Sequence, residues 1–531
     1  MAAEIIPPTA LIQMLVMECG FDRRRIVPSD GFEIHYLNLT PLKLKVSPDS
    51  TPFVISKRLS TRPHVTLAEL YELLQSLSDL SPLASGCVVV FGGTLQALKS
   101  STRRELTKAR IAVLSRGDFQ QAYEREDASE LSNIVASALV SSLGRQSLSP
   151  YHATIPATAG SFFGRAQTLK KVFAVQDNFI FVGNRRIGKT SVLQEIKHRL
   201  TLSKAPVLMA DLYGATCNTM DDVLVRLLKD LDPSGNFERH ATIETLSEIF
   251  RSTVLRLSKQ GLVVVFIDEL DKILEFDRSN GHRLMELFRE VFYRTENTRF
   301  YGAGFRRTRQ AMTDVDAPLY GFTISEQLQR LNLQETRDMI EIPLQNLGID
   351  VRGTAVTEAI YTETTGHPEL VQMCCTKIVS LADEGEAINN PTEMLTQVFQ
   401  SNEFREKVFG AFMANANSAE RLASYLLMQM GIESGTTFDS LEFTMPDINA
   451  CLKRVGKELN LVDLYTVTDH LLLCGVLVQQ RGGSRYRFAI PQLARYCQNS
   501  NLTFMIEKSL DELGPLTTWS EVIRTDPEKQ P

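Results

Sequence analysis

The amino-acid sequence predicts an α/β fold in which a central parallel sheet carries helices on both faces. Apolar segments alternate with amphipathic segments across residues 161–330, and a glycine-rich loop directly follows the first apolar segment. Strands that are apolar along their whole length are buried on both faces, which is typical of parallel sheets joined by helices. We expect a separate α/β domain before this core, and a helical lid and a winged helix after it.

The composition of the chain is typical of a folded, multidomain globular protein. The chain has 531 residues, of which 43% are hydrophobic and 23% are charged, close to the averages for folded globular proteins. At about 150 residues per domain, this length predicts several domains. The net charge of −6 excludes the strong positive field of a general nucleic-acid binder.

Cysteine usage and the chain start give two further expectations. The eight cysteines include no C-x-x-C pair, so we expect reduced thiols and no zinc site. No basic stretch precedes the short apolar run at the start, and no run reaches about 18 apolar residues. We therefore expect a cytoplasmic protein without a membrane partner.

Residues 1–145 are expected to form an α/β domain of their own. After a helix-like start, turn residues separate extended segments from helical ones. The predicted strands are 32–40, 42–47, 53–59, 87–93 and 110–115, and the predicted helices are 66–80, 101–109 and 126–143. Residues 146–160, rich in Ser, Pro and Ala, are expected to be a linker.

The rest of the chain divides into a core and two C-terminal regions. In the core, residues 161–330, the predicted strands are 178–183, 205–213, 262–270 and 299–305, and two of the predicted helices are 190–200 and 282–295. Residues 331–400 are expected to be a helical lid and residues 401–515 a winged-helix-like domain, followed by a tail at 516–531. A Gly-Gly turn predicts a hairpin over 476–490 in the winged-helix-like domain.

The segment GNRRIGKT matches the phosphate-binding pattern G-x-x-x-x-G-K-[ST]. It follows an apolar strand and opens a helix, where backbone N–H groups face phosphate oxygens. Lys189 is expected to neutralise the β- and γ-phosphates, and the Thr190 hydroxyl to bind Mg²⁺. Residues 161–330 are therefore expected to be a P-loop ATPase core. The nucleotide-binding residues predicted from this loop are Gly183, Asn184, Arg185, Arg186, Ile187, Gly188, Lys189, Thr190 and Ser191.

Two carboxylates end the apolar strand LVVVFIDEL. Asp268 is expected at the carboxyl edge of the parallel sheet, where it can hold Mg²⁺. Glu269 follows it and is the candidate general base for the attacking water. No N-K-x-D segment for reading guanine occurs, so ATP is favoured over GTP.

The strand RFYGAGF ends in three arginines. Arg306 or Arg307, or else Arg309, could lie near the γ-phosphate and distinguish a triphosphate from a diphosphate. The alternative is that these residues form a solvated basic loop. We take Arg306 and Arg307 as candidate catalytic residues.

The order of these motifs resembles the STAND-class ATPases of bacteria and archaea, signal-transducing P-loop NTPases related to AAA+ proteins. The resemblance covers about residues 160–500 and includes FFGR, GNRRIGKTSVL, VVVFIDELDKI, EIPLQNLGI and TTGHPELVQMCCTKI. It implies that Phe163, Gly164 and Arg165 border the adenine, although the acidic residue usual after such an arginine is absent. It also implies a slow two-state switch in which ATP holds the core against its lid.

The resemblance further implies that Gly366, His367 and Pro368 form the turn at which the helical lid meets the nucleotide. A local explanation is also open. Proline is favoured as the first residue of a helix, so this turn could simply begin the helix ELVQMCCTKIVSLA.

The N-terminal domain is similar to restriction-endonuclease-like domains of the Mrr-like group. Those nucleases need an acidic residue and a [DE]-x-K triplet to hold a metal that activates water. Here Asp49 is followed by Ile55, Ser56 and Lys57, so the second carboxylate is missing. We expect an inactive or purely binding domain, and Asp49 could equally be a turn residue.

Two functions from different classes are consistent with these motifs. The first is a regulatory ATPase, in defence or another stress response, that meets a protein partner or oligomerises with itself. The second is a DNA-binding initiator or loader, in which Arg481, Arg485 and Arg487 of the predicted hairpin contact phosphates. Residues 401–531 carry 13 Lys and Arg against 16 Asp and Glu, which favours protein docking over DNA binding. A third possibility is a scaffold that binds nucleotide without hydrolysing it. The presence of both Lys189 and Glu269 argues against this possibility.

Overall fold

The computed structural model describes most of the chain. The described residues are 8–29, 32–46, 51–56, 87–91, 111–115, 119, 125, 127–152, 155–203, 205–215, 217–235, 237, 242–383, 391–438, 440–480, 483–499 and 501–513. They fall into two compact units. One unit contains residues 1–164, 333–359 and 371–395, and the other contains residues 165–332, 360–370 and 396–531.

The first unit begins with a mixed five-stranded sheet in the order β1-β2-β3-β4-β5. Strands β1 to β3 are antiparallel neighbours, whereas β3, β4 and β5 are parallel. Helices α1 (Pro8–Met17) and α5 (Ala128–Leu143) accompany the sheet, and α5 contacts β5. The strands are β1 (Asp22–Ser29), β2 (Phe32–Asn38), β3 (Thr51–Ser56), β4 (Cys87–Phe91) and β5 (Ile111–Ser115).

One strand prediction in this unit was wrong, and one strand was missed. Residues 42–46 of the predicted strand 42–47 form no strand, because Pro41 opens the short 3₁₀ helix η1 (Thr40–Leu42) and Lys43 has a left-handed backbone. The alternating Leu42 and Leu44 are nevertheless buried. Strand β1 was not predicted, because its sequence DRRRIVPS lacks apolar alternation. The predicted helices 66–80 and 101–109 lie outside the described residues.

Helical segments complete the first unit. They include α6 (Arg145–Leu148), η4 (Ala159–Ser161) and α14 (Leu333–Asn346), together with parts of α15 (Val356–Thr364) and α16 (Pro368–Asp383). Within the segment expected as a linker, Tyr151 is buried and its hydroxyl donates to the carbonyls of Met339 and Ile340 at 3.1 Å. This segment therefore packs on α14.

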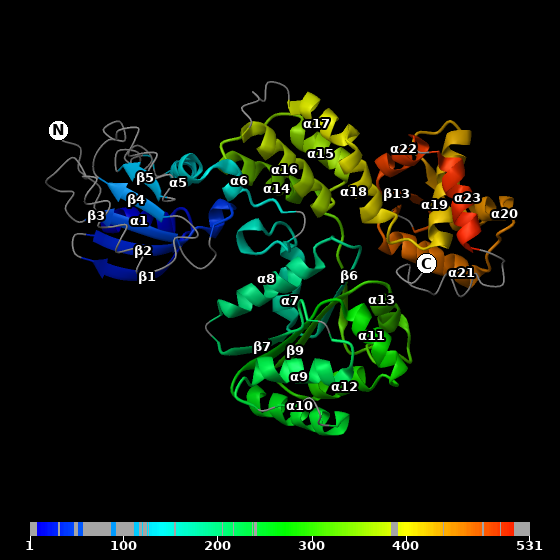
Figure 1. Cartoon of the computed structure of the whole chain (residues 1–531), viewed down its shortest axis with the longest axis horizontal. Helices are drawn as coiled ribbons and strands as arrows, with labels where there is room; N and C mark the ends of the chain where they lie inside the picture. The colour runs from blue at the N-terminus through cyan, green and yellow to red at the C-terminus, as the bar shows by residue number, and fades with distance from the viewer. Residues whose placement is uncertain are drawn as a thin grey trace. The chain divides into compact units, whose positions relative to one another are not determined.

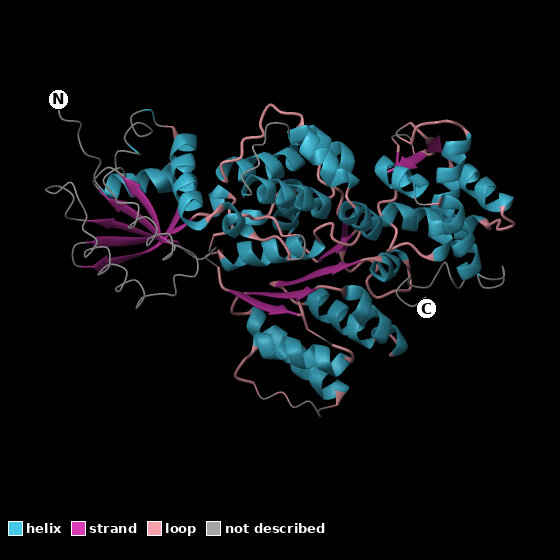
Figure 2. Cartoon of the chain, turned by 45° about the horizontal axis from the view of Figure 1, so that its top comes forward, coloured by secondary structure: helices cyan, strands magenta, loops and turns pink. Residues whose placement is uncertain are grey.

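The second unit contains a parallel five-stranded sheet in the order β10-β6-β9-β8-β7. Figures 1 and 2 show its strands with helices on either side, which confirms the predicted α/β fold. The strands are β6 (Phe179–Val182), β7 (Val207–Asp211), β8 (Leu262–Ile267), β9 (Thr298–Gly304) and β10 (Ile324–Gln327). Strand β10 was not predicted, because its four residues ISEQ alternate at an edge and are only partly buried.

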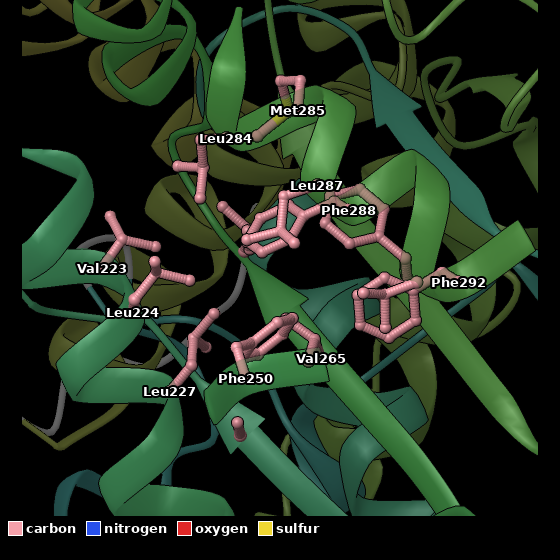
Figure 3. Close-up of a cluster of buried hydrophobic side chains, with 14 of the residues drawn as sticks. Val223, Leu224, Leu227, Phe250, Val265, Leu284, Met285, Leu287, Phe288 and Phe292 are labelled. Atoms are coloured by element: carbon pink, nitrogen blue, oxygen red, sulfur yellow. The ribbon is translucent and has the colours of Figure 1, made fainter. Parts of the chain in front are cut away.

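Alternate residues of β8 are buried on opposite faces of this sheet. Val263, Val265 and Ile267 join a large apolar cluster with α9 (Met220–Leu231), α10 (Ile243–Ser258), α11 (Leu270–Ser279) and α12 (Arg283–Arg294). Figure 3 shows Phe250, Phe288 and Phe292 of this cluster beside Val265. The opposite face includes Val264 and Phe266, which are also buried, while α8 (Lys189–Thr201) contacts β9 and α7 (Ala166–Val175) precedes β6.

The C-terminal part of the second unit is mainly helical, with a small sheet of order β11-β13-β12. Strands β12 (Leu477–Gln479) and β13 (Tyr486–Phe488) are antiparallel neighbours at the predicted hairpin. β11 (Glu442–Phe443) pairs with β13. The helices of this region are α17 (Pro391–Gln400), α18 (Asn402–Phe412), α19 (Ser418–Glu433), α20 (Met445–Arg454), α21 (Leu461–Leu473), α22 (Pro491–Asn499) and α23 (Leu502–Leu513).

The seven cysteines whose side chains are described are free thiols, and all but Cys217 are buried. Burial raises the pKa of Cys375, Cys474 and Cys497 to about 12. Across the described residues, no helix combines the length and apolar character needed to cross a membrane.

Candidate nucleotide site

The phosphate loop connects the end of β6 to the start of α8. Gly183 has φ +154°, and a Cβ added there would approach the Leu328 carbonyl oxygen at 3.1 Å and Ile187 Cγ2 at 3.2 Å. Gly188, with φ +98°, precedes the first residue of α8. Both positions favour glycine, one through crowding and both through backbone angle. The loop therefore has the tight path that brings N–H groups to a helix start.

Lys189 is the first residue of α8, and its ammonium group lies over the loop. It donates to the carbonyl oxygens of Gly183 and Asn184, both at 2.9 Å, and lies 5.8 Å from the centre of the Phe305 ring. Burial lowers the pKa of Lys189, while the carboxylates of Asp271 and Asp268 oppose that shift. The side chain thus places a positive charge where the motif requires one.

The structure brings Thr190 and Asp268 together from segments 78 residues apart. The Thr190 hydroxyl donates to Asp268 Oδ2 at 2.7 Å. Burial raises the pKa of Asp268, and its hydrogen bond with Thr190 opposes this. Hydroxyl and carboxylate oxygens are ligands that Mg²⁺ prefers, together with phosphate oxygens and water. These two residues therefore fit a Mg²⁺ ion, which would neutralise charge on a bound triphosphate.

Glu269 lies at the start of α11 with an exposed side chain. Its backbone has φ +54°, and its carboxylate is 3.8 Å from the Lys272 ammonium group. A left-handed backbone is uncommon for a residue with a Cβ, and such strain is often found at functional sites. The carboxylate is exposed and can therefore meet a water molecule.

Asp271 is a further carboxylate at this site that the sequence patterns did not reveal. Its carboxylate accepts hydrogen bonds from the backbone amides of Phe305, Arg307 and Thr308, and from the Thr308 hydroxyl at 3.0 Å. These bonds join the start of α11 to the start of α13 (Arg306–Thr313). Its place three residues after Asp268, in the first turn of a helix, was the only available indication.

Gly304 is required by this junction. A Cβ at this position would lie 1.9 Å from Thr308 Oγ1 and 2.7 Å from Asp271 Oδ2. Glycine therefore lets β9 end directly against the Asp271 carboxylate, which fixes where the arginines after β9 begin.

Arg306 is buried and bound by groups from the C-terminal region. Its guanidinium donates to both carboxylate oxygens of Glu420, at 2.7 Å for the longer bond, and to the Asn415 carbonyl. Glu420 raises the pKa of Arg306 in spite of burial, and Arg306 keeps the pKa of the buried Glu420 below its usual value. The solvated basic loop that we considered is therefore wrong for Arg306.

The other two arginines also have carboxylate partners. Arg307 lies 3.6 Å from Glu275, and Arg309 lies 3.8 Å from Asp469. Each of the three arginines thus approaches a carboxylate outside the phosphate loop.

The residues expected near the adenine occupy two units. Arg165 is buried in the second unit, and its guanidinium donates to the Ile187 carbonyl of the phosphate loop at 2.9 Å. Phe163 and Gly164 belong to the first unit, where Lys43 lies 5.0 Å from the centre of the Phe163 ring. Arg165 is therefore the member of this group that touches the loop.

The C-terminal region also contacts the phosphate loop itself. The Asn184 side chain donates to the Ala411 carbonyl at 2.8 Å and accepts from Asn415 Nδ2 at 3.1 Å. Arg186 pairs with Glu369, at the start of α16, and Lys407 lies 3.7 Å from the same carboxylate. Arg185 and Ser191 flank these contacts within the loop and the first turn of α8.

His367 and Pro368 lie at the start of α16, as the local explanation of this turn predicts. Pro368 is the first residue of that helix. His367 is fully buried, and its ring packs edge-on against Phe412 with centroids 5.1 Å apart. Burial and the nearby Arg330 lower the pKa of His367 to about 3, so the imidazole is neutral near pH 7.

Of the other candidate sites, the N-terminal pair and part of the hairpin cannot be placed. Asp49, Lys57 and Arg481 lie outside the described residues, and Ile55 and Ser56 are on β3. Arg485 is exposed and pairs with Glu442 at 3.0 Å, and Arg487 is exposed on β13. In the described part of the chain, no cluster of three His, Cys, Asp or Glu residues could hold a metal by itself.

Part of the chain matches a known family model. A family model described as an AAA domain matches residues 175–302, which include the phosphate loop, Asp268 and Glu269. No curated protein sequence matches the chain.

Three solved structures are similar in fold. The Walker-type ATPase PABY2304 of Pyrococcus abyssi has 16% identity and a TM-score of 0.43, covering 64% of this chain and 96% of its own. The ORC2 protein of Aeropyrum pernix has 13% identity and a TM-score of 0.42, covering 65% and 93%. A RuvB variant of Thermotoga maritima has 15% identity and a TM-score of 0.33, covering 62% and 92%.

The buried imidazole of His367 predicts acid sensitivity. Because its pKa of about 3 lies below the ordinary 6.5, protons bind the unfolded chain more tightly, and stability falls as pH drops from 6.5 towards 3. At pH 5.5 this group should cost the wild type about 1 kcal/mol of unfolding free energy relative to neutral pH. His367→Phe should lack this loss. Denaturant unfolding of both proteins near neutral pH and near pH 5.5 measures it, and equal losses would contradict a neutral histidine in the fold.

Proposed function

We propose that this chain, whose residues 175–302 match an AAA domain, is a STAND-type regulatory switch that binds ATP and hydrolyses it slowly with Mg²⁺. The observation that carries the proposal is that the C-terminal region binds the nucleotide site at two places. Arg306, directly after β9, is bound by Glu420, and Asn184 of the phosphate loop is bound by Ala411 and Asn415. A change in the bound phosphates that moves Asn184 or Arg306 would therefore also move α18 and α19.

The catalytic roles follow from the positions of the loop residues. Lys189 and the loop N–H groups would hold the phosphates, Thr190 and Asp268 would hold Mg²⁺, and Glu269 would orient and deprotonate water. Arg306 or Arg307 would reach the γ-phosphate only after leaving its carboxylate partner. Breaking a buried ion pair is costly, so hydrolysis and rearrangement should be slow.

The geometry of the N-terminal sheet supports a binding role for the first unit. An antiparallel hairpin followed by parallel strands agrees with the restriction-endonuclease-like fold, while Ile55 replaces the second carboxylate of the metal triplet. We assign this unit to recognising a signal or partner and not to cleavage. Self-association on ATP binding would then deliver the response.

Two variants of the phosphate site test the ATPase. Lys189→Ala should abolish ATP binding, because the loop loses its cation. Glu269→Gln should keep ATP bound but lower turnover about 100-fold or more, because the general base is lost. Nucleotide binding, phosphate release and molecular size with and without MgATP are measured on the full chain. Turnover by Glu269→Gln at the wild-type rate would remove Glu269 from this role, and ATP binding by Lys189→Ala would remove the loop.

The Arg306–Glu420 pair gives a test of the switch. Glu420→Gln leaves a buried guanidinium without its counter-charge, which should lower stability by about 3–5 kcal/mol and speed ATP turnover severalfold because Arg306 is released. The matched control is Glu433→Gln on the same helix, since Glu433 is exposed and pairs only with Arg454 at 3.2 Å among the described residues. It should change stability by less than about 1 kcal/mol. Loss of stability in Glu420→Gln without faster turnover would make the pair purely structural.

The exposed arginines of the β12–β13 hairpin favour a second candidate, a DNA-binding initiator-like ATPase with a winged helix. Its mark would be duplex binding that weakens steeply with salt, which fluorescence anisotropy at several salt concentrations measures. Arg487→Gln should then lower the slope by about 1. Absence of binding at low salt would leave the switch as the function.

A further inference from the structure

A cavity of about 350 Å³ lies within the second unit, beside the phosphate loop. Asn184 and Ile187 form one side, residues 327–330 at the end of β10 form another, and residues of α21 and β12 also line it. Asn184 and Ile187 belong to the phosphate loop, whereas Gly188, Lys189, Thr190 and Asp268 are not among the residues that line the cavity. Its volume is in the range of small-molecule pockets.

His367 brings a buried polar side chain to this cavity. It is 0% exposed, and its ring meets the backbone of Arg185, which can account for one ring nitrogen. Buried polar atoms are nearly always hydrogen-bonded. A neutral imidazole offers one donor and one acceptor, so one ring nitrogen is left for a ligand in the cavity.

Arg330 brings a partly buried positive charge. Its guanidinium donates to Thr365 Oγ1 and, at 2.7 Å, to the Ala489 carbonyl, both neutral acceptors. Among the described residues no carboxylate lies within ion-pair distance of it. Burial, together with the nearby Arg487, lowers the pKa of Arg330 to about 10. A buried charge without a counter-charge is costly, so an anion here would be stabilising.

The rest of the lining sets the sign and chemistry of the ligand. Arg309 and Asp469 also line the cavity, 3.8 Å apart. Two guanidinium groups and one carboxylate therefore give the cavity a net positive charge. The amides of Gln329 and Gln479 add hydrogen-bonding groups that suit a polar ligand.

We propose that this cavity binds a small phosphorylated molecule, of the size of a nucleoside monophosphate or a sugar phosphate. Its phosphate pairs with the guanidinium of Arg330, whose fork of N–H donors matches two phosphate oxygens. Its other polar groups bond to His367 and to the glutamine amides. The site goes beyond the proposed function and requires no nucleotide on the phosphate loop, although Asn184 makes it a neighbour of that loop.

Calorimetric titration of the full chain in a Lys189→Ala background tests the proposal, because the phosphate loop is then disabled. The probes are AMP, ribose 5-phosphate and inorganic phosphate. AMP or ribose 5-phosphate should bind. A lower Kd for AMP than for ribose 5-phosphate would indicate that the ligand is a nucleotide. Arg330→Gln should raise the Kd about tenfold or more, whereas Arg330→Lys, which keeps the charge, should raise it less. Arg352→Gln, on the surface of the first unit, is the control and should leave the Kd unchanged.

A second variant tests the proposal independently in case Arg330→Gln does not fold. His367→Phe keeps the contact with Phe412 and should fold, yet should lose the ligand-induced rise in melting temperature. Failure of all three probes to bind overturns the proposal, as does binding that neither variant weakens. Inorganic phosphate binding as tightly as both larger probes would overturn the assignment of a phosphorylated molecule. These results are independent of ATP binding by the wild type, so either proposal can fail alone.

Discussion

The parallel register of β6, β9 and β8 is the constraint on which the nucleotide site depends. Val182, the last residue of β6, pairs with Gly304, and Ile267, the last residue of β8, pairs with Gly302. Three chain segments therefore leave the sheet at one edge, although more than 100 residues separate the first from the last. The phosphate loop, Asp268 and the arginines after β9 meet there because parallel strands end together.

A buried ion pair determines which helix packs at that edge of the sheet. Arg306 and Glu420 are both buried, and each would be costly to keep alone in the interior. Their mutual hydrogen bonds hold the C-terminal helix α19 to the end of β9. Arg330 shows the opposite case, a partly buried cation with only neutral acceptors among the described residues. One arginine thus has a counter-charge within the fold, whereas the other has none among the described residues.

The sequence was sufficient for the core of the site and insufficient for its surroundings. Local patterns identified Lys189, Thr190 and Asp268, because a phosphate loop and a buried strand are contiguous in the chain, and the structure brings all three together. Asp271, Glu420 and Arg330 were missed, because their partners lie far away in sequence. The strands β1 and β10 were not predicted from the sequence. The charged residues of β1 and the short, partly buried edge position of β10 leave no clear apolar alternation.

The buried cysteines allow the opening of the two units to be followed separately, by the rate at which each thiol is alkylated. Cys375 belongs to the first unit, and Cys474 and Cys497 belong to the second. With a pKa of about 12, almost none of each thiol is present as thiolate, the form that attacks an alkylating reagent. Modification must wait until the surrounding packing opens, so the order in which these cysteines react records the order in which the units loosen.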